Sequence, residues 1–234
     1  MDGYFLCVDI LGFSEIVKNL SKVKSKNKIK EWVDLVRTSA QTNNIKNYQL
    51  LSDTVFASVL NKDELGNLIS FARTLLEKGI EKSIPIRGGI SYGSFEWSDI
   101  LIYGPAVIEA HIIEQEQQWI GISFSPKIQL NEKVLDEHNL VVYPTPKTNG
   151  YIQLHTVIAW SVPKYSLLSG YLTSSGLGGI PGKGKNLDWN FGYKIQNTII
   201  FGIYLEFLNK TGDTAFKYHG HNPIQFLDEH YRGR

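Results

Sequence analysis

The chain is poor in cysteine, in net charge and in long apolar runs, and each of these shortages excludes a class of protein. Its single cysteine, Cys7, excludes a disulfide framework and a zinc site built from CxxC pairs. The 24 basic and 23 acidic residues nearly cancel, so the net charge of +1 gives no sign of a nucleic-acid partner. The longest nearly unbroken apolar run, Thr198 to Leu208, is shorter than the roughly 20 residues that span a bilayer. We therefore expect neither a nucleic-acid partner nor a membrane span.

The start of the chain also lacks the marks of a secretory signal. The segment MDGYFLCVDILGF has no basic beginning and no small-residue cleavage site. No internal repeat or low-complexity tract is present, which argues against a solenoid. What is present is the composition of a globular protein: 42% of the 234 residues are hydrophobic and 20% are charged. The sequence thus predicts a cytoplasmic protein with a substantial core.

Short apolar runs alternate with helical patterns along the first two thirds of the chain. Strands are predicted at 4–10, 48–51, 55–59, 84–93, 100–103, 119–124, 139–143 and 150–160. Helices are predicted at 29–39, 63–82, 106–118 and 191–208. Two strand–helix–strand crossovers around a central hairpin predict the α/β (α+β) class, as a ferredoxin-like mixed sheet with covering helices. We expect a main domain over residues 1–160 and a helical C-terminal extension over 161–234.

Two aspartates stand at the ends of predicted strands. Asp9 ends the first strand, and Asp53 lies in the tight turn of the hairpin, so both carboxylates are expected at the same edge of the sheet. Either aspartate alone would be typical of a turn or helix cap. Two carboxylates with a backbone carbonyl between them suit Mg²⁺ or Mn²⁺. The turn from Leu11 to Ser14 leads into a helix, whose free N–H groups attract anions. The pattern predicts a nucleoside triphosphate site beside divalent cations.

Four motifs carry a resemblance to a known family. VDILGFS, LLSDTVFAS, PIRGGISYG and YGPAVIEAHIIE resemble, in order and spacing, the class III nucleotidyl cyclase catalytic domain over roughly residues 4–126. The resemblance implies that Asp9 and Asp53 are the catalytic, metal-binding aspartates and that Ile10 offers a backbone carbonyl to the second metal. The later segment PTPKTNGYIQLHTVIAW resembles the strand with the family's phosphate-binding lysine. The implied nucleotide-binding residues are Gly12, Phe13, Ser14, Tyr48, Gln49, Arg87 and Lys147.

The chain departs from the adenylate and guanylate cyclase pattern at the positions that read the purine. Gln49 stands where the family has a base-selecting Lys or Glu, and Leu101 stands where it has an Asp. The transition-state Asn and Arg of the family fall on Ile108 and Ile112. With these departures, the RGGIS-x-G motif, the GPAVIEA helix and the later PTPK strand are most similar to the pyrimidine cyclases of Pycsar antiphage defence.

This resemblance implies an enzyme that converts a pyrimidine ribonucleoside triphosphate, UTP in preference to CTP, to its 3′,5′-cyclic mononucleotide and pyrophosphate. The product would be a second messenger in antiviral defence, read by a separate cyclic-nucleotide-binding effector. The family arrangement implies a homodimer with two composite sites, and residues 1–160 as its catalytic domain. A purine (adenylate) cyclase and an inactive cyclase-fold module that binds nucleotide remain the alternatives.

Several other features leave their meaning open. The lysines between Lys18 and Lys30 are typical of a solvated helix face, or of a rim that attracts phosphate. His111 either contacts a nucleotide or fills a helix face. The segment GIPGKGK fails the P-loop pattern. His219, His221 and His230 fit a polar tail better than a metal cluster. The helix predicted at 191–208 is expected to be buried against the core or, by a slight preference, against a partner.

Overall fold

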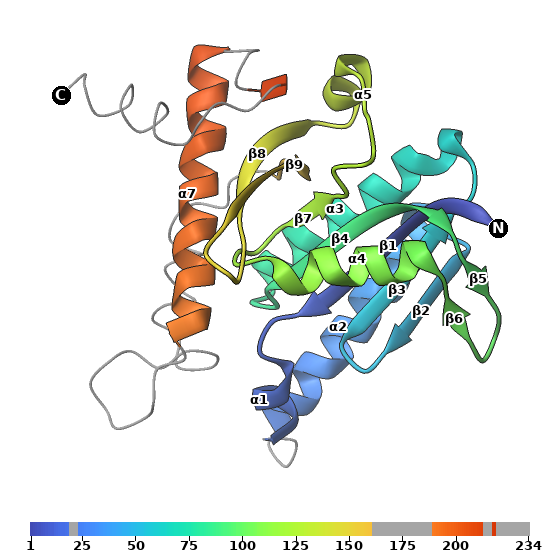
Figure 1. Cartoon of the computed structure of the whole chain (residues 1–234). Helices are drawn as coiled ribbons and strands as arrows, with labels where there is room; N and C mark the ends of the chain where they lie inside the picture. Colours follow the sequence, from blue (N-terminus) through green and yellow to red (C-terminus); the bar gives the residue numbers. More distant parts are fainter. Residues whose placement is uncertain (19–22, 161–188, 213–216, 219–234) are drawn as a thin grey trace, which may run out of the picture.

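The computed structural model describes residues 1–18, 23–160, 189–212 and 217–218 (Figure 1). The strands are β1 (Asp2–Ile10), β2 (Asn47–Leu51), β3 (Thr54–Val59), β4 (Ile86–Ser94), β5 (Glu96–Trp97), β6 (Ile102–Tyr103), β7 (Ile122–Phe124), β8 (Leu140–Pro146) and β9 (Ile152–Ile158). The helices are α1 (Phe13–Lys18), α2 (Val23–Thr42), α3 (Leu65–Glu81), α4 (Pro105–Glu116), α5 (Glu132–Glu137) and α7 (Trp189–Thr211), with a short 3₁₀ turn at Lys62–Glu64.

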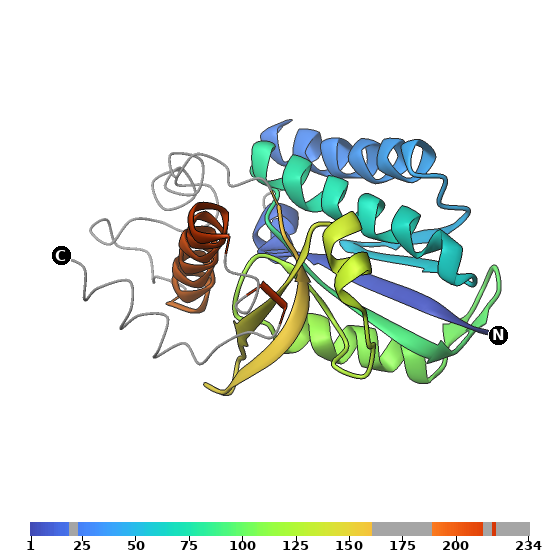
Figure 2. The ribbon, with the colours of Figure 1, turned by 90° about the horizontal axis from the view of Figure 1, so that it is seen from above.

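Seven strands form one mixed sheet in the order β2-β3-β1-β4-β7-β9-β8. β1 is antiparallel to both of its neighbours, β3 and β4, while β4 and β7 run parallel. Viewed from above, α2 and α3 cover one face of the sheet and α4 covers the other (Figure 2). This arrangement confirms the predicted fold class, a mixed sheet with covering helices.

The two faces of β1 bury different sets of side chains. Leu6, Val8 and Ile10 belong to the larger core with α2 and α3, whereas Phe5 and Cys7 belong to a smaller apolar cluster under α4. The split follows from the alternation of side chains along a strand. Asp9 therefore continues the row of Phe5 and Cys7 and lies on the α4 face of the sheet.

α4 can cross β4 closely because of one glycine. A Cβ built at Gly89 would collide with the carbonyl oxygen of Ala110 and with Ile113. α4 begins cleanly after Gly104, whose φ of +137° suits glycine, with Pro105 in the first turn of the helix. The sequence predicted this helix, which the structure starts one residue earlier and ends two residues sooner.

Other boundaries moved because propensity places the ends of elements poorly. α2 reaches back to Val23 and so includes several lysines of the basic stretch, among them the exposed Lys26 and Lys30. The sequence did not predict α5, whose six residues begin after an Asn131 side chain that accepts a hydrogen bond from the Val134 backbone N–H at 3.0 Å.

α7 packs on the chain's own core. Phe201 is fully buried between Trp119, Tyr143 and Trp160, with ring centroids 4.6 to 5.7 Å apart. The hydroxyl of Tyr204 donates a hydrogen bond to the Val142 carbonyl at 2.9 Å. Burial against the core, the first of the two expectations for this helix, is therefore what the structure shows, although the preference was for a partner.

Two further findings concern the C-terminal third. The division of the chain after residue 160 stays a prediction, but α7 shares one hydrophobic core with the strands. The segment GIPGKGK at 179–185 and the histidines at 219, 221 and 230 lie outside the described residues. Within the described ranges, no helix combines the length and the apolar character needed to cross a bilayer.

Candidate active site

The structure brings Asp9 and Asp53 to the same end of the sheet. The register of β1 and β3 pairs Val8 with Val55, which places Thr54 beside Asp9. The Thr54 hydroxyl donates a hydrogen bond to Asp9 Oδ1 at 3.1 Å. Asp53 precedes Thr54 in the tight turn between β2 and β3, where Ser52 has a φ of +60°. The hairpin geometry expected from the sequence thus sets two carboxylates next to one another.

The environment of Asp9 disfavours its negative charge. Burial, and after it the nearby carboxylates of Glu114 and Asp53, raise the pKa of the Asp9 carboxyl to about 7, although the hydrogen bond from Thr54 and the Arg87 guanidinium oppose the shift. A divalent cation would compensate this accumulation of negative charge. The donor set also fits such an ion, because two carboxylates and a backbone carbonyl, here that of Ile10, are the oxygen ligands that Mg²⁺ and Mn²⁺ prefer.

A third carboxylate, which no motif of the sequence singles out, lies on the same face of the sheet. The Glu114 side chain is only 2% exposed, and its Oε1 lies 2.5 Å from Arg87 Nε. Burial raises the pKa of Glu114, and the Arg87 guanidinium opposes the shift. Its position three residues after His111 on a helix was the available signal, because residues so spaced share a face. That signal becomes specific only when the helix is placed over β4.

Arg87 is held in place by the same helix. Besides its ion pair with Glu114, its Nη1 donates hydrogen bonds to the carbonyls of Gln115 at 3.1 Å and Gln117 at 3.4 Å. In the register of the sheet, Arg87 of β4 stands directly opposite Asp9 of β1. The guanidinium therefore connects the end of α4 to β4, the strand next to the one that carries Asp9, and its positive charge partly offsets the carboxylates.

Lys147 lies just beyond β8, next to the end of α4. Its backbone forms a β-bridge with Gln117, whose side-chain amide donates a hydrogen bond to the Gly88 carbonyl at 2.5 Å. The Lys147 ammonium lies 3.7 Å from Glu116 Oε2 and is nearly buried. Burial lowers its pKa, and Glu116 opposes the shift. Through Gln117 and Arg87, the lysine belongs to the same end of the sheet as the aspartates.

Neighbouring residues of β2 point to opposite faces. Gln49 pairs with Phe56 of β3, which in turn pairs with Cys7 of β1, so the three form one row across the sheet. Phe56 packs against the cluster under α4, which puts half-buried Gln49 on the face of Asp9. Tyr48 packs instead against the larger core on the other face. The alternation therefore turns Tyr48 away from the side of the sheet that carries the aspartates.

The loop after β1 has the expected turn and helix. Gly12 adopts a φ of +81°, and α1 begins at the next residue. Phe13 packs against the larger core, while Ser14 is exposed. The backbone at Gly12 to Ser14 thus follows directly on Asp9 and Ile10, but the Phe13 side chain serves packing.

Three residues at positions where the family has polar groups lie on the outside of the chain. Leu101, between β5 and β6, is 55% exposed, and on α4 Ile108 is 61% and Ile112 is 46% exposed. The structure does not bring their side chains to the buried carboxylates within this chain. His111, between them, is also half exposed.

The chain is similar to known proteins in its structure but not detectably in its sequence. No protein-family model and no curated protein matches the sequence. The guanylate cyclase domain of RhGC from Catenaria anguillulae, solved in complex with GTP, has a TM-score of 0.53 and 16% identity over 68% of this chain and 97% of that one. The monomeric guanylyl cyclase domain of the RhoGC fusion protein from Blastocladiella emersonii has a TM-score of 0.54 and 16% identity, over 68% of this chain and 96% of that one. The same domain, solved as a non-canonical dimer, has a TM-score of 0.51 and 16% identity, over 68% of this chain and 97% of that one.

This chain has the nucleotidyl cyclase fold. The neighbouring domains are covered almost completely, so the 32% of this chain that the match with the RhGC domain leaves uncovered is additional to a whole cyclase domain. Because the identity is 16%, the likeness establishes the fold, and the roles of individual residues rest on the geometry described above. In the nucleotidyl cyclase fold of this chain, the two aspartates lie at one end of the central strands, and Arg87 of β4 stands opposite Asp9 of β1.

Proposed function

We propose that this protein is a nucleotide cyclase that converts a pyrimidine ribonucleoside triphosphate, UTP in preference to CTP, to the 3′,5′-cyclic mononucleotide and pyrophosphate. The observation that carries the proposal is the meeting of Asp9 and Asp53 at one end of the sheet in a cyclase fold. Burial and the carboxylates of Glu114 and Asp53 raise the pKa of Asp9, and carboxyl groups perturbed in this way are frequent at functional sites.

The reaction forms one bond and breaks one. The ribose 3′-oxygen attacks the α-phosphorus, the bond from that phosphorus to the oxygen bridging to the β-phosphate breaks, and the hydroxyl proton passes to water. Bound Mg²⁺ or Mn²⁺, two ions by analogy with the family, would lower the pKa of the 3′-hydroxyl and neutralise the triphosphate. Asp9, Asp53 and the Ile10 carbonyl are the proposed ligands. Catalysis otherwise depends on positioning, because the transferred phosphoryl group needs an in-line approach.

The remaining proposed contacts surround this centre. The proposed ligands of the phosphate oxygens are the backbone N–H groups from Gly12 to Ser14, which come shortly after Asp9 at the start of α1. Arg87 and Lys147 supply positive charge at the same end of the sheet, although each is paired with a carboxylate in this chain. In this proposal the two ion pairs hold the side chains of Arg87 and Lys147 in place. The paired carboxylates offset the positive charge of these side chains until a triphosphate competes for it.

The choice of a pyrimidine rests on the positions that read the base. Gln49 has both a donor and an acceptor, so its amide can pair with uracil or cytosine by rotation. Leu101 cannot accept a hydrogen bond from an adenine amino group. A polar group left unsatisfied on burial costs about 1–3 kcal/mol, roughly tenfold to hundredfold in affinity. Tyr48, turned to the opposite face, is withdrawn from base contact in this proposal.

The base preference is tested by competition. The purified protein is incubated with equal amounts of ATP, GTP, UTP and CTP and with Mn²⁺, and the cyclic products are identified by mass. We expect cUMP first, then cCMP, with cAMP and cGMP at least roughly tenfold lower. ATP or GTP as the best substrate would establish the alternative, a purine cyclase, which the purine-binding structural neighbours favour. No product from any of the four would leave a non-catalytic module.

A pair of variants separates base reading from a general loss of activity. Gln49→Ala removes the amide from the face that carries Asp9 and should reduce the preference for UTP over ATP by about tenfold. Lys46→Ala, an exposed residue just before β2, is the matched control and should retain the wild-type preference. An unchanged preference in Gln49→Ala would remove Gln49 from the proposal.

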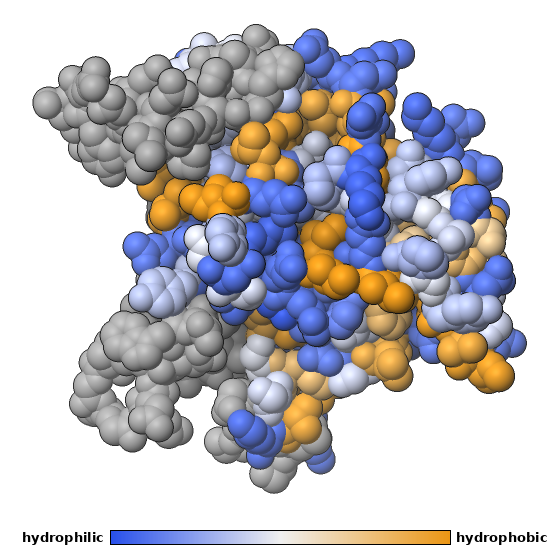
Figure 3. Space-filling model, viewed as in Figure 1, coloured by the Kyte–Doolittle hydropathy of each residue, from blue (hydrophilic) through white to orange (hydrophobic). Residues whose placement is uncertain are grey.

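A homodimer is proposed on the exposed apolar side of α4. Ile108 and Ile112 lie one helical turn apart on the surface, and the adjacent β5–β6 hairpin exposes Ile100, Leu101 and Tyr103. Hydrophobic surface is visible over α4 and over this hairpin in Figure 3. Several exposed apolar side chains gathered on one side of a protein are typical of an interaction site. Light scattering should give about twice the chain mass of 26.5 kDa. Ile108→Glu should yield the monomer, whereas Val23→Glu, exposed at the start of α2, should not. A fully active wild-type monomer would contradict the dimer.

The proposed biological role follows from the resemblance to pyrimidine cyclases of antiphage defence. The cyclic mononucleotide would act in the cytoplasm as a second messenger and activate a separate effector that binds it. The role requires the product to rise in infected cells that carry the active protein, and not in cells that carry the Asp9→Asn variant.

A further inference from the structure

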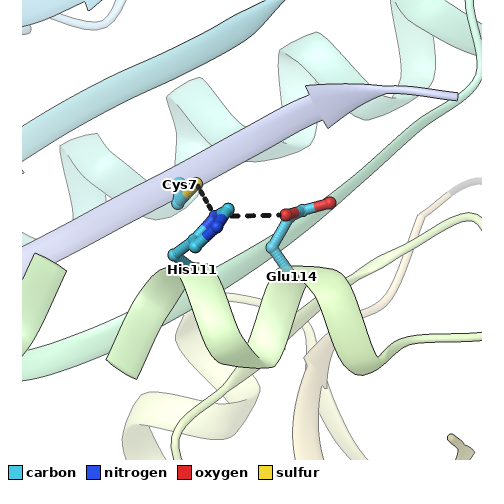
Figure 4. Close-up of side chains that lie close together, drawn as sticks. All are labelled: Cys7, His111 and Glu114. Carbon is cyan, nitrogen blue, oxygen red and sulfur yellow. Dashed lines mark hydrogen bonds and ion pairs between the residues drawn. The ribbon is translucent and has the colours of Figure 1, made fainter. Parts of the chain in front are cut away.

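Three potential metal ligands of different chemistry converge between β1 and α4 (Figure 4). Cys7 comes from β1, and His111 and Glu114 come from α4. One ligand atom from each lies within 4.8 Å of the other two. The His111 Nδ1 atom lies 3.9 Å from Cys7 Sγ and 3.5 Å from Glu114 Oε2. The imidazole thus stands between a thiol and a carboxylate.

The fold explains why these residues meet. Cys7 points towards α4 because it lies on the same face of β1 as Phe5 and Asp9. His111 and Glu114 are three residues apart on α4 and therefore share the helix face that is turned to the sheet. The absence of a side chain at Gly89 lets α4 approach the strands. The packing of α4 on the sheet beside β1 therefore brings the three side chains together.

The spacing of the ligand atoms suits a tetrahedral zinc ion. With Zn–S of about 2.3 Å and Zn–N or Zn–O of about 2.0–2.1 Å, tetrahedral angles give a sulfur–nitrogen separation of about 3.6 Å and a nitrogen–oxygen separation of about 3.4 Å. The observed separations are 3.9 and 3.5 Å. The remaining separation, from the sulfur to the carboxylate, is at most 4.8 Å, so binding of the ion would have to bring these two atoms closer by up to about 1.2 Å.

Both the types of ligand and their exposure to solvent favour a zinc ion. A thiolate, an imidazole and a carboxylate match Zn²⁺, whereas the all-oxygen set of Asp9 and Asp53 matches Mg²⁺ or Mn²⁺. Cys7 and Glu114 are buried, and the half-exposed His111 opens the cluster to solvent, from which water can supply a fourth ligand. Two anionic ligands would balance the charge of a divalent ion.

We propose that Cys7, His111 and Glu114 form a binding site for Zn²⁺ that is separate from the aspartate pair. The site holds one ion per chain, and Glu114 Oε2 serves it while Oε1 keeps its contact with Arg87. The proposal concerns metal binding alone and does not depend on cyclase activity.

The test uses Co²⁺ as a spectroscopic substitute for Zn²⁺. Cobalt bound to a thiolate gives a sulfur-to-metal charge-transfer band, and Cys7 is the chain's single cysteine. Cobalt held by the five other histidines of the sequence, or by the aspartates, gives no such band. The whole protein is titrated with Co²⁺ in excess Mg²⁺, which occupies oxygen sites. We expect the band to saturate at one ion per chain and to vanish when Zn²⁺ is added. A wild-type protein without the band would overturn the proposal.

Variants locate the ion. His111→Ala removes a half-exposed ligand and leaves buried Cys7 in place, so the protein should fold, and its affinity for Co²⁺ should fall by at least the roughly 10–100-fold that loss of an outer-shell partner costs. Cys7→Ser should abolish the band. Glu109→Gln, on the same helix but bound to Ser125 and Lys127, is the matched control and should bind Co²⁺ like the wild type. Equal affinity in His111→Ala and the wild type would refute the site.

Discussion

Asp9→Asn and Asp53→Asn should each lower the kcat of the cyclase reaction by about a thousandfold or more. Each change removes one charged ligand from the proposed cation site, and loss of the cations withdraws several kcal/mol of stabilisation from the transition state. The rate is measured with the best of the four nucleotides and Mn²⁺. Asp34→Asn, an exposed change on α2 over the opposite face of the sheet, is the matched control and should retain full activity.

Loss of activity in Asp9→Asn should not come from loss of the fold. Because the pKa of Asp9 is raised in the native state, the native state binds its proton more tightly than the unfolded chain does. Its contribution to stability is therefore present at low pH and is lost as the pH rises through about 7. Above neutrality, metal-free Asp9→Asn should unfold with a free energy equal to or above that of the wild type. Substantial turnover by either variant would contradict the two-aspartate centre.

Phe201→Ala should destabilise the protein by about 3–5 kcal/mol, the usual cost of truncating a buried aromatic side chain. Phe201 is fully buried, with its ring edge-on to Trp119 and Tyr143. The free energy of unfolding is measured in urea with the full chain. Ile200→Ala, the neighbouring residue on α7 and 40% exposed, is the matched control and should cost well under half as much. A Phe201→Ala protein as stable as the wild type would show that α7 folds apart from the sheet.

Local patterns predicted most of the elements because their signals are short in range. The hairpin of β2 and β3 follows from two apolar runs around a tight polar turn, and α3 follows from apolar residues at helical spacing. The boundaries of β4 and α2 were less accurate, since the end of an element depends on its hydrogen-bond partners and not on its own residues. The short helix α5 has too few residues to show a period.

The aspartate pair was predictable for a topological reason. Once β3 lies beside β1, residues at the end of β1 and in the turn before β3 must lie close together, whatever the other side chains are. The direction of Tyr48 could not be predicted in the same way. Either face of an edge strand can pack, and only its burial against the larger core decides which side chain joins Gln49 on the face of Asp9.

The sequence by itself indicated the class of the fold and the place of Asp9 and Asp53, because the order of strands and helices predicts a mixed sheet in which the hairpin lies beside the first strand. Only the tertiary structure decided which other groups join them. Glu114 and Cys7 are separated by 107 positions, and they meet because α4 crosses the sheet at Gly89. The docking of α7 likewise depends on a pocket between aromatic side chains from three separate segments. Such contacts depend on the angle and distance between packed elements, which no local pattern specifies.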